Sequence, residues 1–168
     1  AIQQGIADAN RICIYGGSYG GYASLEGVVK EPDLYKCAVG YAGVYDLIML
    51  RGRADTIAGE MLTPFMKSTL GDDEAALKEH SPVFHVDKIK AALFLAHGGH
   101  DTTVPIAHAE ELKDALDKLN KPYGWLTYPN EAHGFYATAH NVAFYSQMSE
   151  FFDKYIGPDA AKTAPAKP

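Results

Sequence analysis

Short apolar runs alternate along the chain with helix-compatible segments. The runs that predict strands are 11–15, 37–42, 91–96 and 125–128, and the first three of them predict buried strands. Strands buried on both faces are continuously apolar, whereas amphipathic helices carry apolar residues every three or four positions. The segments that predict helices are 1–7, as the last turns of a helix, 22–30, 73–79, 110–119 and 137–155. This alternation predicts an α/β fold with a mostly parallel sheet and flanking helices.

The segment 43–73 interrupts this alternation. It mixes apolar and aromatic residues with Gly52, Gly59 and Pro64, which predicts short helices in a long excursion above the sheet. Long connections between strands are often functional. We therefore expect this excursion to form a lid or a wall of a substrate site.

Composition and charge exclude several function classes. Of the 168 residues, 15 are Lys or Arg and 21 are Asp or Glu, which gives a formal net charge of −6. Without a block of basic residues, we expect neither a nucleic acid nor an anionic membrane surface as a partner. The apolar runs are too short to predict a membrane span.

The two cysteines, Cys13 and Cys37, each lie in a predicted buried strand. A disulfide is conceivable if those strands are neighbours. Buried thiols more often act as small hydrophobic side chains, so we expect two free thiols and infer no redox role.

The turn between the first strand and the next helix holds the clearest chemical signal. Residues 16–21 are Gly-Gly-Ser-Tyr-Gly-Gly, which contains the Gly-x-Ser-x-Gly nucleophile elbow, a strained turn that exposes a serine hydroxyl above the sheet. We expect Gly16 and Gly20 to lie where strand and helix leave no room for a Cβ atom. A phosphate-binding loop is not favoured, because the turn has neither Gly-x-Gly-x-x-Gly nor a closing Lys-Ser/Thr.

A serine nucleophile needs a base and an orienting acid. Asp101 follows the third predicted strand and His133 the fourth, at the strand ends where open α/β sheets build their sites. The order Ser18, Asp101, His133 is that of α/β-hydrolases. We predict that Ser18 attacks a carbonyl carbon, His133 moves its proton and Asp101 orients the imidazole. The backbone N–H of Tyr19 is the predicted oxyanion donor.

Other residues of the same types compete for these roles. Asp46 also follows a strand, and Asp101 could instead cap the helix near Pro105. The histidines that compete with His133 are His97, His100 and His140. His97 and His100 with Asp101 lack a fourth metal ligand at a recognisable spacing, so we predict no metal site. We interpret three further histidines as surface or core residues: His80, His85 and His108.

Together these motifs resemble the prolyl oligopeptidase family of serine peptidases, close to its dipeptidyl-peptidase and acylaminoacyl-peptidase branches. The resemblance runs from about residue 10 to residue 155. It rests on 11–22, 81–82, 97–105, 131–135 and 151–155. It implies hydrolysis of short peptides through an acyl-enzyme on Ser18, without a cofactor.

The resemblance also implies where substrate binds. The implied pocket walls are Tyr19, Val44, Leu47, Leu50 and Val104. An uncharged apolar pocket suits small or apolar side chains such as alanine or proline. Two alternatives remain: a carboxylesterase that uses the same triad, and an inactive fragment that needs its N-terminal part and serves as a binding piece.

Members of this family carry a β-propeller ahead of the hydrolase domain, which itself opens with several strands before the elbow. We therefore expect residues 1–157 to be the C-terminal part of an α/β-hydrolase domain that lacks its first strands, with an open sheet edge along 11–15. Residues 158–168 predict a disordered Ala/Lys/Pro tail. The missing N-terminal part and the propeller are expected partners. A homo-oligomer also fits, and both cytoplasm and periplasm fit as compartments.

Overall fold

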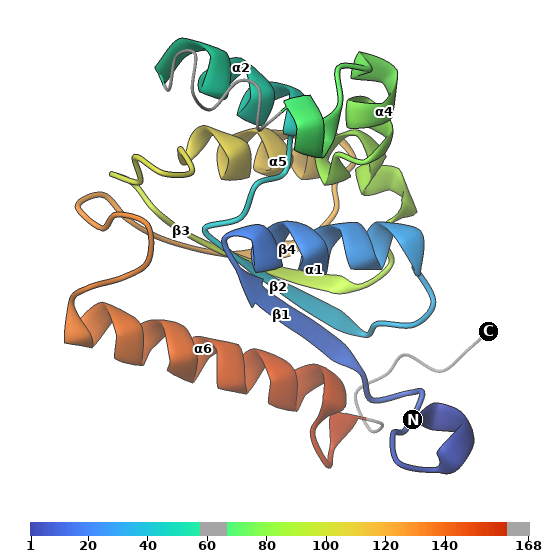
Figure 1. Ribbon diagram of the computed structural model, residues 1–168. Helices are drawn as coiled ribbons and strands as arrows, with labels where there is room; N and C mark the ends of the chain where they lie inside the picture. Colours follow the sequence, from blue (N-terminus) through green and yellow to red (C-terminus); the bar gives the residue numbers. More distant parts are fainter. Residues whose placement is uncertain (58–66, 161–168) are drawn as a thin grey trace.

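Four strands form one parallel sheet at the centre of the molecule (Figure 1). The computed structural model describes residues 1–57 and 67–160. The strands are β1 Cys13–Gly17, β2 Cys37–Tyr41, β3 Ala92–Gly98 and β4 Tyr123–Tyr128, and they lie side by side in the order β1-β2-β3-β4. Every neighbouring pair is parallel. The predicted mostly parallel α/β architecture is confirmed.

Helices connect the strands and cover the sheet. They are η1 Ile2–Gln4, α1 Tyr19–Lys30, α2 Leu47–Ile57, α4 Glu74–Glu79, η2 Pro82–Lys88, α5 Ala107–Lys118 and α6 Thr138–Ile156. The helix predicted over 1–7 is only the short η1, which ends at Gly5 in the left-handed conformation (φ 70°). The predictions for Gly59, Pro64 and the tail beyond residue 160 lie outside the described residues.

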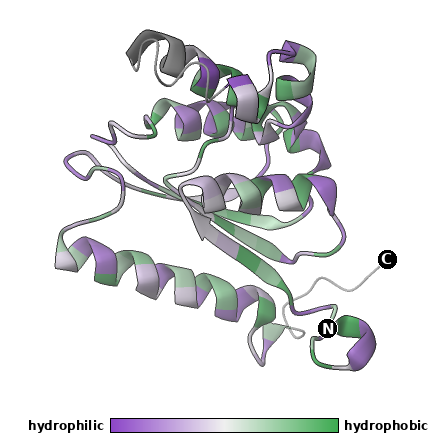
Figure 2. Cartoon of the chain, in the orientation of Figure 1, coloured by the Kyte–Doolittle hydropathy of each residue, from purple (hydrophilic) through white to green (hydrophobic). Residues whose placement is uncertain are grey.

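The two faces of the sheet are covered by different helices. Figure 1 shows α1 and α5 on one face and α6 alone on the other. Alternate residues of β3 divide between these layers: Leu93 and Leu95 pack with α1 and α5, whereas Phe94 and Ala96 pack with Phe144 of α6. Figure 2 shows the apolar strands between these helices. Within the described residues, no helix has the length and apolar character that crossing a membrane requires.

The first strand, β1, lies at one edge of the sheet, where the described residues pair it with β2 alone. Its burial is therefore partial, and Tyr15 is 40% exposed. The prediction of a fully buried strand here is wrong because both faces of a strand are covered only inside the sheet. The predicted open edge is present among the described residues.

Cys13 and Cys37 form a disulfide bond. The register of the parallel strands places the two residues opposite one another, with their Cα atoms 4.7 Å apart. The expectation of two free thiols is therefore wrong. The physical reason is the pairing register of β1 with β2, because facing cysteines at this separation lie within the usual bonding range.

Candidate active site

Ser18 occupies the sharp turn between β1 and α1. Its φ of 58° and ψ of −123° lie in a region that costs a non-glycine residue about 1–3 kcal/mol. The surrounding structure holds the turn in place: the Ser18 N–H donates to the Tyr41 carbonyl at 2.8 Å. The serine hydroxyl is thereby presented at the carboxyl end of the sheet, as the elbow motif predicts.

The glycines around Ser18 allow this turn to pack closely. A Cβ atom on Gly16 would lie 2.2 Å from the Gly20 carbonyl oxygen, so Gly16 is needed as predicted. Gly20 itself has open space where its Cβ atom would stand, and the prediction for that position is wrong. The crowded glycine of the helix is Gly21, whose Cβ atom would lie 2.8 Å from the Gly43 backbone.

The structure brings Ser18, His133 and Asp101 together in one hydrogen-bonded series. His133 Nε2 lies 2.9 Å from Ser18 Oγ, and His133 Nδ1 lies 2.8 Å from Asp101 Oδ2. A carboxylate accepts but does not donate, so Nδ1 carries the proton and Nε2 is free to accept the serine proton. The Asp101 side chain is fully buried, whereas the His133 side chain is 25% exposed.

Asp101 is fixed by the turn that follows β3. Its Oδ1 accepts the backbone N–H groups of Thr103 at 2.9 Å and Val104 at 2.8 Å. These bonds leave Oδ2 directed at His133. Asp101 therefore bonds the imidazole through Oδ2, while Oδ1 stabilises the turn at residues 101–104.

His97 lies beside Asp101 but does not act as a base in this arrangement. The ring is buried, and its Nε2 donates to the Val104 carbonyl at 2.8 Å while standing 3.4 Å from Asp101 Oδ2. Burial lowers the pKa of His97, against the opposing effect of that carbonyl. His97 is therefore neutral at pH 7 and supports the loop.

Two other competitors are engaged elsewhere. Asp46 Oδ1 accepts the N–H groups of Ile48 and Met49 in the first turn of α2, and His140 pairs with Glu131 at 2.5 Å. Within residues 1–57 and 67–160, no cluster of three or more His, Cys, Asp or Glu side chains could hold a metal ion.

Tyr19, the predicted oxyanion donor, is the first residue of α1. The first N–H groups of a helix lack intrahelical acceptors and carry the positive end of the helix dipole. The Tyr19 N–H is thus available next to the Ser18 hydroxyl, on the element that follows the nucleophile. Such a group can stabilise negative charge on a carbonyl oxygen.

An apolar cavity of about 430 Å³ opens next to the elbow. Its walls are Tyr19, Tyr22, Val44, Leu47, Leu50, Thr69, Leu70, Ala76, Leu77 and His80. Four of the five residues implied by the resemblance line it. The fifth, Val104, packs behind the wall in a cluster with Val44, Leu47 and Leu77. The sequence did not identify the contribution of 69–80, because a polar helix pattern does not reveal which residues turn toward a distant elbow.

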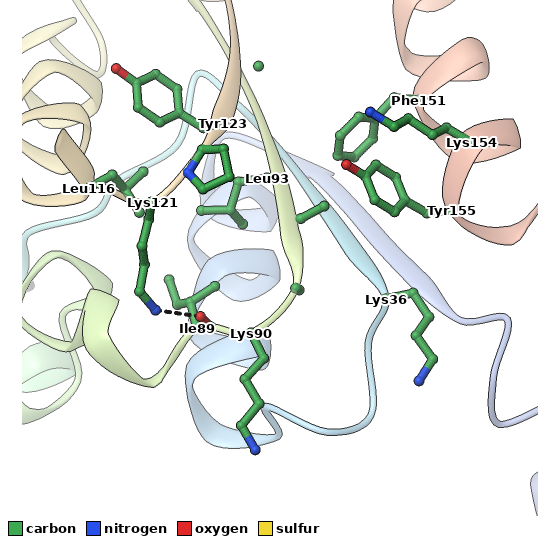
Figure 3. Close-up of a pocket in the computed structure, with 14 residues that line it drawn as sticks. Lys36, Ile89, Lys90, Leu93, Leu116, Lys121, Tyr123, Phe151, Lys154 and Tyr155 are labelled. Carbon is green, nitrogen blue, oxygen red and sulfur yellow. Dashed lines mark hydrogen bonds between the residues drawn. The ribbon is translucent and has the colours of Figure 1, made fainter. Parts of the chain in front are cut away.

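A second cavity, of about 580 Å³, lies at the opposite end of the sheet (Figure 3). Its rim carries Lys36, Lys90, Lys121 and Lys154. Three of these ammonium groups already have partners: Lys121 donates to the Ile89 carbonyl at 2.6 Å, and Lys90 pairs with Asp33 at 2.8 Å. The Lys154 ammonium group lies over the Tyr155 ring, 5.3 Å from its centroid. None of the three residues in the hydrogen-bonded series lines this cavity.

The loop that bears His133 is held by two residues that sequence reasoning did not assign. The Tyr41 hydroxyl accepts a hydrogen bond from the N–H of Phe135, and the Glu131 carboxylate accepts from Tyr136 and Ala137. Only the folded conformation of the loop reveals these contacts. In the sequence, Glu131 is simply an acidic residue near a histidine.

Comparison with known proteins places the chain in a family. Residues 1–159 match the model of the prolyl oligopeptidase family. The chain is 30% identical over 162 residues to dipeptidyl aminopeptidase BIII of Pseudoxanthomonas mexicana, covering 94% of this chain and 23% of that protein. It is 25% identical over 162 residues to the acylamino-acid-releasing enzyme of Arabidopsis thaliana, covering 92% and 21%.

Solved structures agree with this match. A Mycobacterium tuberculosis puromycin-hydrolyzing peptidase superposes with a TM-score of 0.83 at 28% identity, over 93% of this chain and 23% of that one. The chain thus spans about a quarter of the length of the proteins it matches. The α/β-hydrolase fold and the predicted resemblance are confirmed, and the chain belongs to the prolyl oligopeptidase family, a family of serine peptidases.

Proposed function

We propose that this chain carries the catalytic triad of a peptidase that hydrolyses short peptides through an acyl-enzyme on Ser18. The observation that carries the proposal is the unbroken series of hydrogen bonds from Asp101 through His133 to Ser18. The strained backbone of Ser18 is a second support, because strain at a turn is retained where the surrounding structure uses it.

The proposed reaction follows from these positions. Ser18 Oγ attacks the peptide carbonyl carbon while His133 Nε2 takes the hydroxyl proton, and the carbonyl oxygen becomes an oxyanion that the Tyr19 N–H stabilises. His133 then gives the proton to the leaving amine as the C–N bond breaks. Water then attacks the resulting ester while His133 Nε2 takes its proton, and His133 returns this proton to Ser18 Oγ as the acyl–oxygen bond breaks and the acid product leaves. Asp101 stabilises the imidazolium in both halves.

We assign the apolar cavity beside the elbow to the side chain of the residue whose carbonyl is attacked. Its walls are apolar apart from Thr69, His80 and the tyrosine hydroxyls, so small or apolar side chains fit it, including alanine and proline. The names of the relatives, a dipeptidyl aminopeptidase and a puromycin-hydrolyzing peptidase, favour a peptidase over a carboxylesterase. Within the whole protein, we propose that an N-terminal hydrolase part and a β-propeller complete the site.

The test is labelling of the whole protein with a fluorophosphonate, followed by intact-mass analysis. We expect one adduct on the wild type and none on Ser18→Ala, with turnover of a peptide anilide reduced on the order of 10⁶-fold. Ser146→Ala, which removes an exposed hydroxyl from α6, is the matched control and should label normally.

Three results would contradict the proposal or narrow it. An adduct that persists on Ser18→Ala would exclude Ser18 as the nucleophile. Hydrolysis of an ester without hydrolysis of an anilide would favour the carboxylesterase. If the whole protein is labelled and the folded 168-residue chain is not, then the chain alone is the inactive fragment and the site needs its N-terminal part.

A further inference from the structure

One side chain, that of Glu131, closes the loop that carries His133. The loop leaves β4 and leads to α6, which covers the face of the sheet opposite α1 and α5 (Figure 1). Glu131 is only 5% exposed, and its carboxylate accepts the N–H groups of Tyr136 at 2.6 Å and Ala137 at 3.0 Å. Because these donors lie beyond residue 133 and the acceptor lies before it, the bonds hold the loop as a closed ring.

A third hydrogen bond fastens this ring to α6. His140 Nδ1, in the first turn of α6, lies 2.5 Å from Glu131 Oε1, and it must donate because a carboxylate only accepts. The His140 ring also stacks on Tyr128, the last residue of β4, with ring centroids 3.6 Å apart. The bond from the Tyr136 N–H, followed by those from His140 and Ala137, lowers the pKa of Glu131 and keeps the carboxylate ionised at neutral pH.

The main chain of Glu131 contacts the loop of the orienting acid. Its carbonyl oxygen accepts the N–H of His100, the neighbour of Asp101, at 2.8 Å. Gly98, at the end of β3, allows this approach, since a Cβ atom there would lie 2.4 Å from the Glu131 oxygen. The loops of Asp101 and His133 are therefore fastened to each other at residue 131.

We propose that Glu131 is a positioning residue that sets the His133 imidazole between Asp101 and Ser18 before substrate binds. This inference rests on the proposed function and adds to it. Glu131 acts through the backbone of residues 132–137 and does not touch the reacting atoms. The imidazole must keep bonds of 2.8 and 2.9 Å on its two sides, and a displacement of about 1 Å at such a site costs about 10²-fold in rate.

The test compares Glu131→Gln with Glu150→Gln in the whole protein. Both changes convert a carboxylate to an amide of the same size, but Glu150 is exposed on α6. For Glu131→Gln we expect kcat and the rate of fluorophosphonate labelling to fall by about 10- to 10²-fold. KM should stay within about twofold, because the cavity walls come from other segments, 19–50 and 69–80. Glu150→Gln should match the wild type.

A second variant keeps the test decisive if Glu131→Gln fails to fold. His140→Ala removes only the bond from α6 and leaves both backbone donors on Glu131, so we expect a smaller loss of kcat with KM unchanged. The proposal is overturned if folded variants keep the wild-type kcat, or if only KM changes. If the wild type itself is not labelled at Ser18, the proposed function fails first, and this inference fails with it.

Discussion

The turns that hold Asp101 and Asp46 are alike in local structure and differ in what surrounds them. Each turn follows a strand, and each aspartate is 6% exposed. In both turns Oδ1 accepts the backbone N–H groups two and three residues further along the chain. A short polar side chain after a strand forms this arrangement readily, so the local pattern alone does not identify a catalytic acid.

The surroundings of the two carboxylates explain their different roles. Asp101 faces the imidazole of His133, whose positive charge it can stabilise. Asp46 faces another acid, Glu111, and burial together with the Asp46 charge raises the pKa of Glu111. The side-chain partner recorded for the Asp46 carboxylate is therefore a second acid and not an imidazole. Asp46 instead begins α2, the helix that contributes Leu47 and Leu50 to the cavity wall.

Strand order determines which aspartate meets the histidine. Asp101 follows β3, and β3 lies directly beside β4, whose loop carries His133. Asp46 follows β2, which has β1 and β3 as its neighbours. For these residues at strand ends, the neighbouring strand therefore decides which side chains meet, more than the residue type or its turn does.

Replacing either carboxylate by an amide separates the roles of Asp101 and Asp46. Asp101→Asn should lower kcat about 10⁴-fold, because an amide in place of the carboxylate favours the wrong imidazole tautomer. Asp46→Asn keeps an acceptor for the helix and should change kcat only a few-fold. Steady-state kinetics on a peptide anilide, with the whole protein, measures both. If Asp46→Asn is the more damaging change, the assignment of the acid is wrong.

A smaller effect is expected when the cap of α2 is removed. Asp46→Ala leaves the N–H groups of Ile48 and Met49 without their acceptor, which should cost about 1 kcal/mol of the free energy of unfolding. Because α2 lines the cavity, we expect KM to rise more than kcat falls. Urea unfolding and steady-state kinetics measure the two quantities.

The matched control for this substitution is Asp8→Ala. Asp8 also accepts a backbone N–H with Oδ1, from Asn10, in an exposed turn before β1. Asp8→Ala should leave KM unchanged, because Asp8 does not line the cavity. An equal rise in KM for both variants would show that Asp46 has no particular influence on the cavity.

The sequence predicts the positions of Ser18, Asp101 and His133 because each follows the end of an apolar run, and parallel strands bring such ends to one edge. The elbow is predictable for the same local reason, since Gly-x-Ser-x-Gly specifies its own turn. The fold class follows from the alternation of strand and helix patterns. These features depend on short segments, which a single sequence describes well.

Features that depend on register or on distant packing could not be predicted. The disulfide between Cys13 and Cys37 requires these residues to face one another across β1 and β2. The crowding at Gly21 comes from Gly43, which lies after the next strand. Glu131 meets its donors only because the loop turns back at Gly134, whose φ is 101°. Each case needs the relative position of two segments.

The smallest expected effect concerns His97, the buried histidine beside Asp101. Its ring donates to the turn, whereas His108 beside Asp46 accepts the Asp46 N–H on Nδ1 at 3.4 Å. Burial lowers the pKa of His97 in the folded protein. Below the ordinary value of about 6.5, the unfolded chain therefore binds more protons than the folded one. Neutral His97 therefore makes its full contribution to the free energy of unfolding above about pH 6.5. This contribution declines as the pH falls toward the lowered pKa of His97 in the folded protein.

We therefore expect the wild type to lose stability relative to His97→Gln as the pH falls from 8 to 6. The difference should be less than about 1 kcal/mol, the most that one histidine of ordinary unfolded pKa can supply over this range. Urea unfolding at a series of pH values measures it, and His100→Gln, at an exposed position, controls for the substitution itself. Parallel stability curves for the wild type and His97→Gln would mean that His97 is not held neutral beside Asp101.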